Sequence, residues 1–244
     1  MNRYSVLIPL IFAAAPAAAQ QADWTYTATI YAWLPDISTR LDTFNFGSLQ
    51  SDIAASDVLS ALDMAFFGAF TAQNGRMGFA ADLVYSDLSE TKPKPGPLFS
   101  DGTLSTQLTA LSAYGLYRVT ADPQVDVDLG VGLRYINLEA TAELTPGILG
   151  GRTESAGGDW VDPLVAARIS VKLNDQWRLK GFADWGGVGS GDESWQVYAG
   201  ATYAINDRWS TDFGYRYLDI SNDLKGRDIS TNLSGPLVGF TYSF

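Results

Sequence analysis

The stretch Val238-Gly239-Phe240-Thr241-Tyr242-Ser243-Phe244 decides the fold class. Side chains of an extended strand point alternately to its two faces, so the four large apolar residues of this stretch share one face. The other face carries only Gly239, Thr241 and Ser243. An apolar face backed by small residues is typical of a strand that lies between lipid and the lumen of a membrane β-barrel. We therefore expect a barrel whose last strand runs to Phe244.

The same alternation recurs along the chain, in segments that are long enough to cross a membrane as tilted strands. Short turns such as Asn74-Gly75-Arg76 alternate with mostly longer connections. This order predicts an all-β fold, a transmembrane antiparallel up-and-down β-barrel of ten strands; eight is the alternative, if two weaker segments belong to loops. The expected strands cover residues 24–34, 64–73, 77–89, 104–119, 125–138, 160–173, 177–188, 195–205, 209–220 and 233–244.

Alternation alone does not say which face is inside, because a soluble barrel of the lipocalin type turns its apolar face inward. Aromatic spacing favours the membrane. On four strands an apolar residue just after a short turn is followed eight positions later by an aromatic residue. That distance is ~26 Å along a strand and ~20 Å across a bilayer at a tilt of ~40°, close to the apolar band of an outer membrane. The pairs are Met77 with Tyr85, Val127 with Tyr135, Trp177 with Trp185, and Trp209 with Tyr217.

The N-terminal residues 1–19 have the pattern of a secretory signal peptide. Met1-Asn2-Arg3 is a positive start, an apolar core follows from Tyr4 to Ala15, and Ala17-Ala18-Ala19 fits a cleavage site. The core is too short for a membrane-spanning helix. We expect cleavage near Ala19 and one β-barrel domain over residues 20–244, without disulfides because the chain has no Cys.

The C-terminal stripe of Val238, Phe240, Tyr242 and Phe244 resembles the signal that the β-barrel assembly machinery reads in bacterial outer-membrane proteins. Segments such as Tyr31-Ala32-Trp33-Leu34-Pro35 and Gly214-Tyr215-Arg216-Tyr217 resemble a largely uncharacterised family of small proteobacterial outer-membrane β-barrel proteins. The resemblance covers the whole mature chain. It implies a place in the outer membrane, next to lipid and lipopolysaccharide, and it implies no activity.

The face that we expect to line the lumen carries charges of both signs in equal number. A balanced set in a narrow space favours ion pairing, because unpaired buried charges are costly. One interpretation is a structural polar core that fills a small barrel, and the other is a narrow pore lined by both signs. The residues are Asp82, Asp126, Asp128, Asp162, Asp184 and Asp212 against Arg134, Arg168, Lys172, Arg178, Lys180 and Arg216.

The sequence contains no His, which argues against several kinds of chemistry. A Ser-His pair needs an imidazole as the base, and zinc sites without Cys or His are rare. We therefore expect no enzymatic activity, no cofactor and no resident metal. A pI near 4.3 also disfavours nucleic-acid binding.

The expected outer connections are acidic, with 16 Asp or Glu against 6 Lys or Arg over residues 35–63, 90–103, 139–159, 190–193 and 219–230. Such loops can hold divalent cations, and through them the phosphates of lipopolysaccharide. The first connection also predicts a short helix, with an N-cap at Ser56-Asp57 and an apolar face of Val58, Leu59 and Leu62, lying on the rim or in the barrel mouth.

Two functions are compatible with these features. The first is a structural or narrow porin-like barrel that passes ions or small solutes poorly. The alternative is a surface-exposed binding module, in which the acidic loops contact divalent cations, lipopolysaccharide or a host surface. The sequence does not identify the solute, the ligand or the oligomeric state.

Overall fold

The computed structural model describes residues 24–43, 47–93, 99–120, 122–147, 150–187, 192–223 and 228–244. The expected signal peptide and its cleavage site lie outside these residues. No helix in the described ranges is long and apolar enough to cross a membrane. The elements are β1 (Thr25–Trp33), β2 (Asp36–Thr43), β3 (Gly47–Ile53), α1 (Ala55–Ala61), β4 (Leu62–Asn74), β5 (Met77–Pro93), β6 (Phe99–Arg118), β7 (Val125–Pro146), β8 (Arg152–Lys172), β9 (Trp177–Gly186), β10 (Glu193–Ala204), β11 (Trp209–Asp223) and β12 (Asp228–Ser243).

Ten of these strands close into an antiparallel barrel, as the sequence predicts. The order is β1, then β4 through β12 in sequence, and β12 pairs back onto β1 from Thr27–Ser243 to Trp33–Leu237. We call the end with the short turns after β4, β6, β8 and β10 the turn end, and the opposite end the loop end. Both Tyr26 and Phe244 lie at the turn end, joined by two backbone hydrogen bonds of 3.1 and 3.3 Å.

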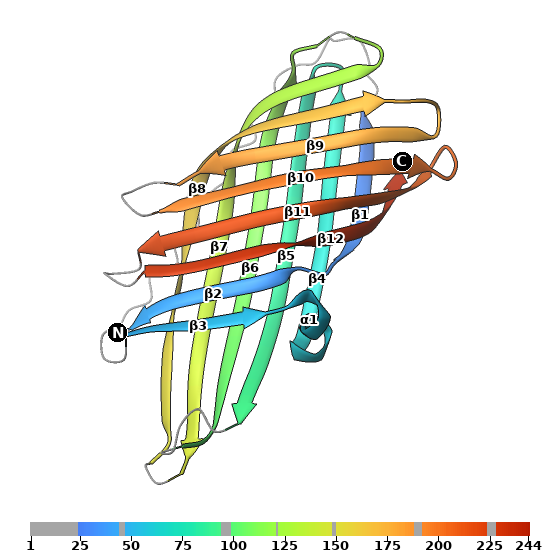
Figure 1. The fold of residues 1–244 in the computed structure, drawn as a ribbon. Coiled ribbons are helices and arrows are strands. Elements are labelled where there is room, and N and C mark those ends of the chain that lie inside the picture. The colour runs from blue at the N-terminus through green and yellow to red at the C-terminus, as the bar shows by residue number, and fades with distance from the viewer. Residues whose placement is uncertain are drawn as a thin grey trace.

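The remaining strands β2 and β3 form a hairpin that continues the barrel wall at the loop end (Figure 1). β12 is long enough to pair with β1 over its C-terminal half and with β2 over its N-terminal half, from Ile229–Leu41 to Ser234–Asp36. The expected long connection at residues 35–63 is therefore mostly regular structure.

Helix α1 follows this hairpin at the expected place, but its expected N-cap is wrong. The N-cap is Ala54, and it makes no side-chain capping bond. The exposed first turn is instead satisfied by Asp36, whose carboxylate accepts a hydrogen bond of 2.7 Å from the Ala55 amide. Val58 is buried as expected, whereas Leu62 belongs to β4. Because this capping residue, Asp36, lies in β2 and not next to the helix in the sequence, the local sequence does not reveal it.

The connection expected at residues 139–158 is also largely strand. β7 and β8 stay paired from Val125–Val171 to Leu144–Arg152, so the two strands extend well past the expected boundary (Figure 1). Gly157 is part of this ladder, and a Cβ there would lie 2.8 Å from the Glu139 Cα. A glycine that looks like a loop residue in the sequence thus permits close approach of two strands.

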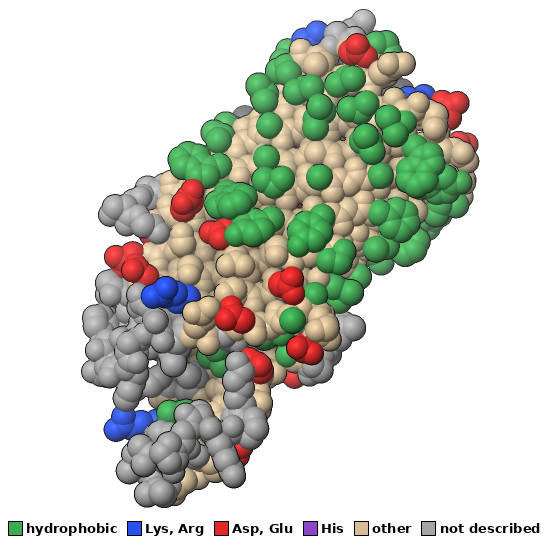
Figure 2. Space-filling view, viewed as in Figure 1, with side chains coloured by type: hydrophobic (Ala, Val, Ile, Leu, Met, Phe, Trp, Pro, Cys, Tyr) green, Lys and Arg blue, Asp and Glu red, His purple; other side chains and the backbone are tan. Residues whose placement is uncertain are grey.

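The apolar faces of the strands point outward, which confirms the membrane orientation and excludes the soluble alternative. Ile30 is 64% exposed and Val131 is 67% exposed, although both are aliphatic. Figure 2 shows apolar side chains gathered over the turn-end part of β9 to β12, with acidic side chains beyond them towards the loop end. Aromatic rings touch across neighbouring strands at both borders, as in Trp177–Tyr203 (5.0 Å) and Trp195–Tyr217 (4.7 Å).

The interior is divided into two layers that differ in chemistry. The half near the turn end holds the charged side chains, as expected. The half near the loop end is an apolar core, which the sequence analysis did not predict. Its fully buried members include Val84, Leu108, Ile136, Leu138, Leu218, Ile220, Ile229 and Leu233, together with Val58 of α1 and Trp33 of β1.

Candidate functional site: the charged lumen and its apolar ceiling

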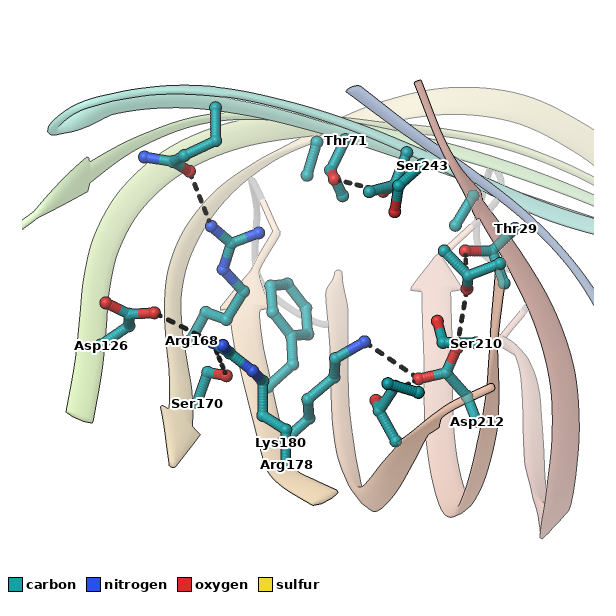
Figure 3. A pocket seen from close by; sticks show the side chains of 18 of the residues that line it. Thr29, Thr71, Asp126, Arg168, Ser170, Arg178, Lys180, Ser210, Asp212 and Ser243 are labelled. Atoms are coloured by element: carbon teal, nitrogen blue, oxygen red, sulfur yellow. Dashed lines mark hydrogen bonds and ion pairs between the residues drawn. The ribbon is translucent and has the colours of Figure 1, made fainter. Parts of the chain in front are cut away.

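The charged half of the lumen encloses a cavity of about 700 Å³. Turn residues such as Asn174 and Asp207 lie on its border, so the cavity opens at the turn end. Figure 3 shows side chains from both walls pointing into it, including Arg168 and Arg178 on one side and Asp212 on the other. Alternation along each strand places these polar groups on the inner face, opposite the lipid-facing apolar residues.

Three arginines hold two aspartates at one wall of the cavity. Asp128 is almost completely buried and forms salt bridges with Arg118 at 2.9 Å and with Arg168 at 2.7 Å. Asp126 lies nearer the opening and forms salt bridges with Arg118 at 2.9 Å and with Arg178 at 3.3 Å. Since each carboxylate has two cationic partners, this wall is a network rather than a row of separate pairs.

Lys180 on β9 reaches over β10 to Asp212 on β11, at 2.9 Å (Figure 3). The same carboxylate accepts hydrogen bonds from the hydroxyls of Thr202 on β10 and Thr241 on β12. Asp212 therefore has partners on three neighbouring strands and is held in one position.

Arg134 on β7 lies beside Tyr114, which lines the cavity, and has no exposed surface. One guanidinium nitrogen, Nη2, donates to both oxygens of Asp184, at 2.7 and 2.8 Å. The other nitrogens donate to Ser112 and Ser194, each at 2.9 Å. Tyr114 completes the group, since its hydroxyl donates to Asp184 at 2.6 Å.

Arg216 on β11 forms a second group of the same kind. It donates to Asp82 and to the Tyr31 hydroxyl, each at 2.7 Å, and its guanidinium lies 5.1 Å from the centre of the Trp33 ring. The Trp33 indole belongs to the apolar core. Arg216 therefore joins the charged layer to the apolar layer.

Two similar pieces of sequence build these two groups. Gly132-Leu133-Arg134-Tyr135-Ile136 and Gly214-Tyr215-Arg216-Tyr217-Leu218 each place glycine, arginine and an aliphatic residue on the inner face. The glycine leaves room for a tyrosine ring of the neighbouring strand: Tyr114 lies over Gly132 and Tyr198 over Gly214. The arginine is the last charge of the lumen, and the aliphatic residue starts the apolar core.

All twelve charged residues expected in the lumen lie inside the barrel, either on the cavity or buried beside it. Ten of them take part in the ion pairs between lumen residues described above. Asp162 is buried and instead accepts hydrogen bonds from Trp160 (3.3 Å) and from Ser194. Lys172 lies at the opening and pairs with Asp175 of the turn at 2.8 Å, which lowers the pKa of that carboxyl.

Sequence reasoning missed Arg118 and the tyrosines Tyr31 and Tyr114. Arg118 ends β6 on the same face as Ser112 and Tyr114, so strand parity alone would have identified it. Tyr114 has the same parity, but aromatic residues also form the outer girdles, so residue type did not mark Tyr114 or Tyr31 as part of the lumen.

In the part of the chain that the structure describes, no group of three acidic side chains is arranged to hold a metal ion. The expected assembly residues lie on the outer face of β12, with Val238, Phe240 and Phe244 exposed and Tyr242 half-buried. Their position fits contact with lipid or with an assembly partner equally well.

Barrel, lipid face and lumen together define a class, the bacterial outer-membrane β-barrel proteins. Residues 5–236 match the family described as "Outer membrane protein beta-barrel domain", and the chain belongs to this family. Its location is therefore the bacterial outer membrane. A comparison with curated protein sequences finds no match.

Solved structures give the same fold. The outer membrane protease OmpT from Escherichia coli is similar with a TM-score of 0.61 at 10% identity, over 93% of this chain and 99% of that chain. The translocator domain of the autotransporter NalP from Neisseria meningitidis has a TM-score of 0.52 at 14% identity, over 93% and 90% of the two chains. At these identities the likeness concerns the barrel alone and says nothing of proteolysis or transport here.

Proposed function

We propose that the protein is a structural barrel of the outer membrane whose lumen is closed at the loop end. The observation that supports this proposal is the apolar layer above Arg134 and Arg216. Its members come from β5, β6 and β7 on one wall and from β11 and β12 on the opposite wall, and they form one cluster. Aliphatic side chains therefore meet across the lumen.

An ion that crossed this layer would have to give up its water without finding polar partners, which is costly. Apolar constrictions close channels by the same effect. The layer below adds to the closure, because Arg134 is bound to Asp184 and Arg216 to Asp82. The paired charges thus serve as a polar core, and the narrow-pore interpretation has less support.

Single-channel recording of the refolded mature protein in a planar bilayer tests the proposal, after a gel-shift check that the barrel has folded. We expect a silent bilayer. A variant in which residues 37–60 are replaced by a short Gly-Ser linker removes Val58 but keeps the aliphatic residues of β5–β7, β11 and β12, so we expect it to stay silent as well. Discrete steps in the unaltered protein that change with Arg168→Glu would refute the closed barrel and favour a narrow channel.

A second candidate is binding of a small charged solute in the cavity from the turn end. Its volume of about 700 Å³ lies within the ~300–1,000 Å³ of small-molecule sites, and Arg178 and Lys180 expose 42% and 37% of their side chains. Equilibrium dialysis with a panel of small carboxylates and phosphates tests it. Lys180→Met should weaken such binding, and a panel without any binder would end this candidate.

We propose no catalytic role for the lumen, because its carboxylates are occupied by cations and hydroxyls and the chain has no His. Contact of the acidic outer loops with divalent cations and lipopolysaccharide remains a prediction. Neutralising the acidic residues of the first and third outer connections should abolish cation-dependent lipopolysaccharide binding. Unchanged binding would remove the surface-binding alternative.

A further inference from the structure

The barrel wall is interrupted between β1 and β4. Their pairing runs from Thr25–Gln73 to Ile30–Gly68 and ends there. β1 nevertheless continues to Trp33 and β4 begins six residues earlier, at Leu62. In the described residues these free lengths pair only on their other sides, β1 with β12 and β4 with β5. The two strands separate shortly before β2 replaces β1 as the partner of β12.

A cavity of about 330 Å³ occupies this separation, and it is lined by residues of both faces of the sheet. Ile30 and Phe66 point to the lipid, with 64% and 51% of their surface exposed. Trp33, Val58 and Leu88 belong to the buried apolar core. Because one cavity touches both sets, it passes through the wall and connects the lipid-facing surface with the apolar interior.

The lining is almost entirely apolar. Ser86 and Tyr31 supply the side-chain hydroxyls, and the Tyr31 hydroxyl donates to Asp82 at 2.8 Å. Among the side chains that the structure describes, no charged one lines the cavity. The chemistry of the lining therefore suits a hydrocarbon chain and gives a polar ligand nothing to bind.

The aromatic residues at the membrane border show where the cavity lies relative to the bilayer. Phe66 pairs with Tyr85, one of the aromatic residues at the loop-end border of the membrane. On the other side of the separation, Ala32 pairs with Val238, which pairs in turn with the lipid-facing Phe213. The cavity therefore lies at the loop-end edge of the apolar band, within reach of the leaflet that faces out of the cell.

Strand edges that face hydrocarbon without partners are costly, and barrels avoid them. An apolar group that fills the cavity restores van der Waals contacts to the side chains around the separated strands, and it keeps water out of the cavity. The material that surrounds this position is lipid, because the cavity is continuous with the lipid-facing surface at Ile30 and Phe66.

We propose that the separation between β1 and β4 binds one acyl chain of a lipid from the surrounding outer leaflet. The chain enters between Ile30 and Phe66 and ends against the apolar core near Val58 and Leu88. This site is independent of the charged lumen. The barrel remains closed to ions, whether or not the acyl chain binds.

Photolabelling in vesicles tests the proposal. The mature protein is refolded into vesicles of phosphatidylethanolamine and phosphatidylglycerol that contain a phospholipid with a diazirine at the end of one acyl chain. Labelled residues are then mapped by peptide mass spectrometry. We expect label on the inward-facing Trp33, Val58 or Leu88 as well as on lipid-facing residues throughout the barrel.

Ala32→Trp places a large side chain at the entrance, and Ala183→Trp is the matched control on the lipid-facing side of β9. We expect interior labelling to fall about tenfold in Ala32→Trp, equivalent to roughly 1.4 kcal/mol of affinity, and to persist in Ala183→Trp. If Ala32→Trp does not fold, Ala65→Phe fills the cavity from the β4 side. Label confined to lipid-facing residues, or interior label that survives both filling variants, would overturn the proposal.

Discussion

Arg134 has no exposed surface, and every contact of its guanidinium is made inside the barrel. A buried ion pair contributes little net stability compared with an apolar pair of the same shape. Loss of one partner is different, because the other charge then stays buried alone. The buried ion pair with Asp184 thus makes each residue dependent on the other.

We expect Arg134→Met to lower the free energy of unfolding by about 3–5 kcal/mol, since Asp184 loses its cation. Arg178→Met is the control, because Arg178 is half-exposed and its pair with Asp126 should contribute about 1 kcal/mol or less. Urea unfolding in detergent micelles, followed by the gel shift, measures both. Equal losses in the two variants would contradict the burial argument.

Addition of one methyl group at Gly132 tests how closely the neighbouring strands β6 and β7 pack. A Cβ at this position would lie 2.5 Å from the Ala113 carbonyl oxygen and 2.6 Å from the Tyr114 ring, so we expect Gly132→Ala to cost about 1–3 kcal/mol, because both the neighbouring backbone and that ring must shift. Gly115→Ala is the control, because its Cβ would meet no atom within 4 Å. The same unfolding assay applies. Similar stability of both variants would show that the Ala113 backbone and the Tyr114 ring adjust without cost.

At the scale of elements, β12 determines how the barrel closes. It pairs with β11 along its whole length, with β1 at the turn end and with β2 at the loop end. Its apolar stripe is the clearest strand signal in the sequence. Closure through β12 therefore depends on residues that also form the expected assembly signal.

Phe244→Ala should reduce the amount of assembled barrel in cells several-fold, if the assembly machinery reads this side chain. Refolding of the purified protein should change little, because the backbone bonds between Phe244 and Tyr26 remain possible. Phe213→Ala removes a comparable lipid-facing ring from β11 and serves as the control. Heat-modifiability of membrane fractions gives the measurement, and equal assembly of the two variants would contradict a specific signal.

Strand boundaries were predicted best where a turn residue forms hydrogen bonds with the backbone of the turn. Asn174 and Asn206 each accept hydrogen bonds from the backbone amides two and three residues further on, which ends β8 and β10 near the expected positions. The loop end was predicted less well. β2 and β3 depend on pairing with β12, and the start of α1 depends on Asp36, so neither is visible in a local pattern.

At the scale of the whole molecule, the lipid face is a band that surrounds the barrel between two aromatic borders. Val131 lies midway between Val127 and Tyr135 and is 67% exposed. Val131→Arg should therefore destabilise the protein in a bilayer by about 2–4 kcal/mol, and Val119→Arg, just past the turn-end border, by about 0–1 kcal/mol. Reversible unfolding in lipid vesicles measures the difference. Equal costs would place the membrane elsewhere.

The sequence by itself determined the ten strands, their alternating faces and the twelve lumen charges. These features follow from the period of two and from turn chemistry, which are local. Which charges pair, and how far the lumen extends, is decided by the tertiary structure, because Arg134 meets Asp184 and Arg216 meets Asp82 only after the sheet closes.

The apolar ceiling and the separation between β1 and β4 also belong to the tertiary structure. Ile136 and Leu218 continue the inner face of their strands, but in the sequence each follows an outward-facing tyrosine and gives no sign of the partners that it meets across the lumen. The separation begins after Ile30 and Gly68, where β1 keeps its pairing with β12 but loses its pairing with β4. Contacts between residues so far apart in the chain are formed only by closure of the barrel.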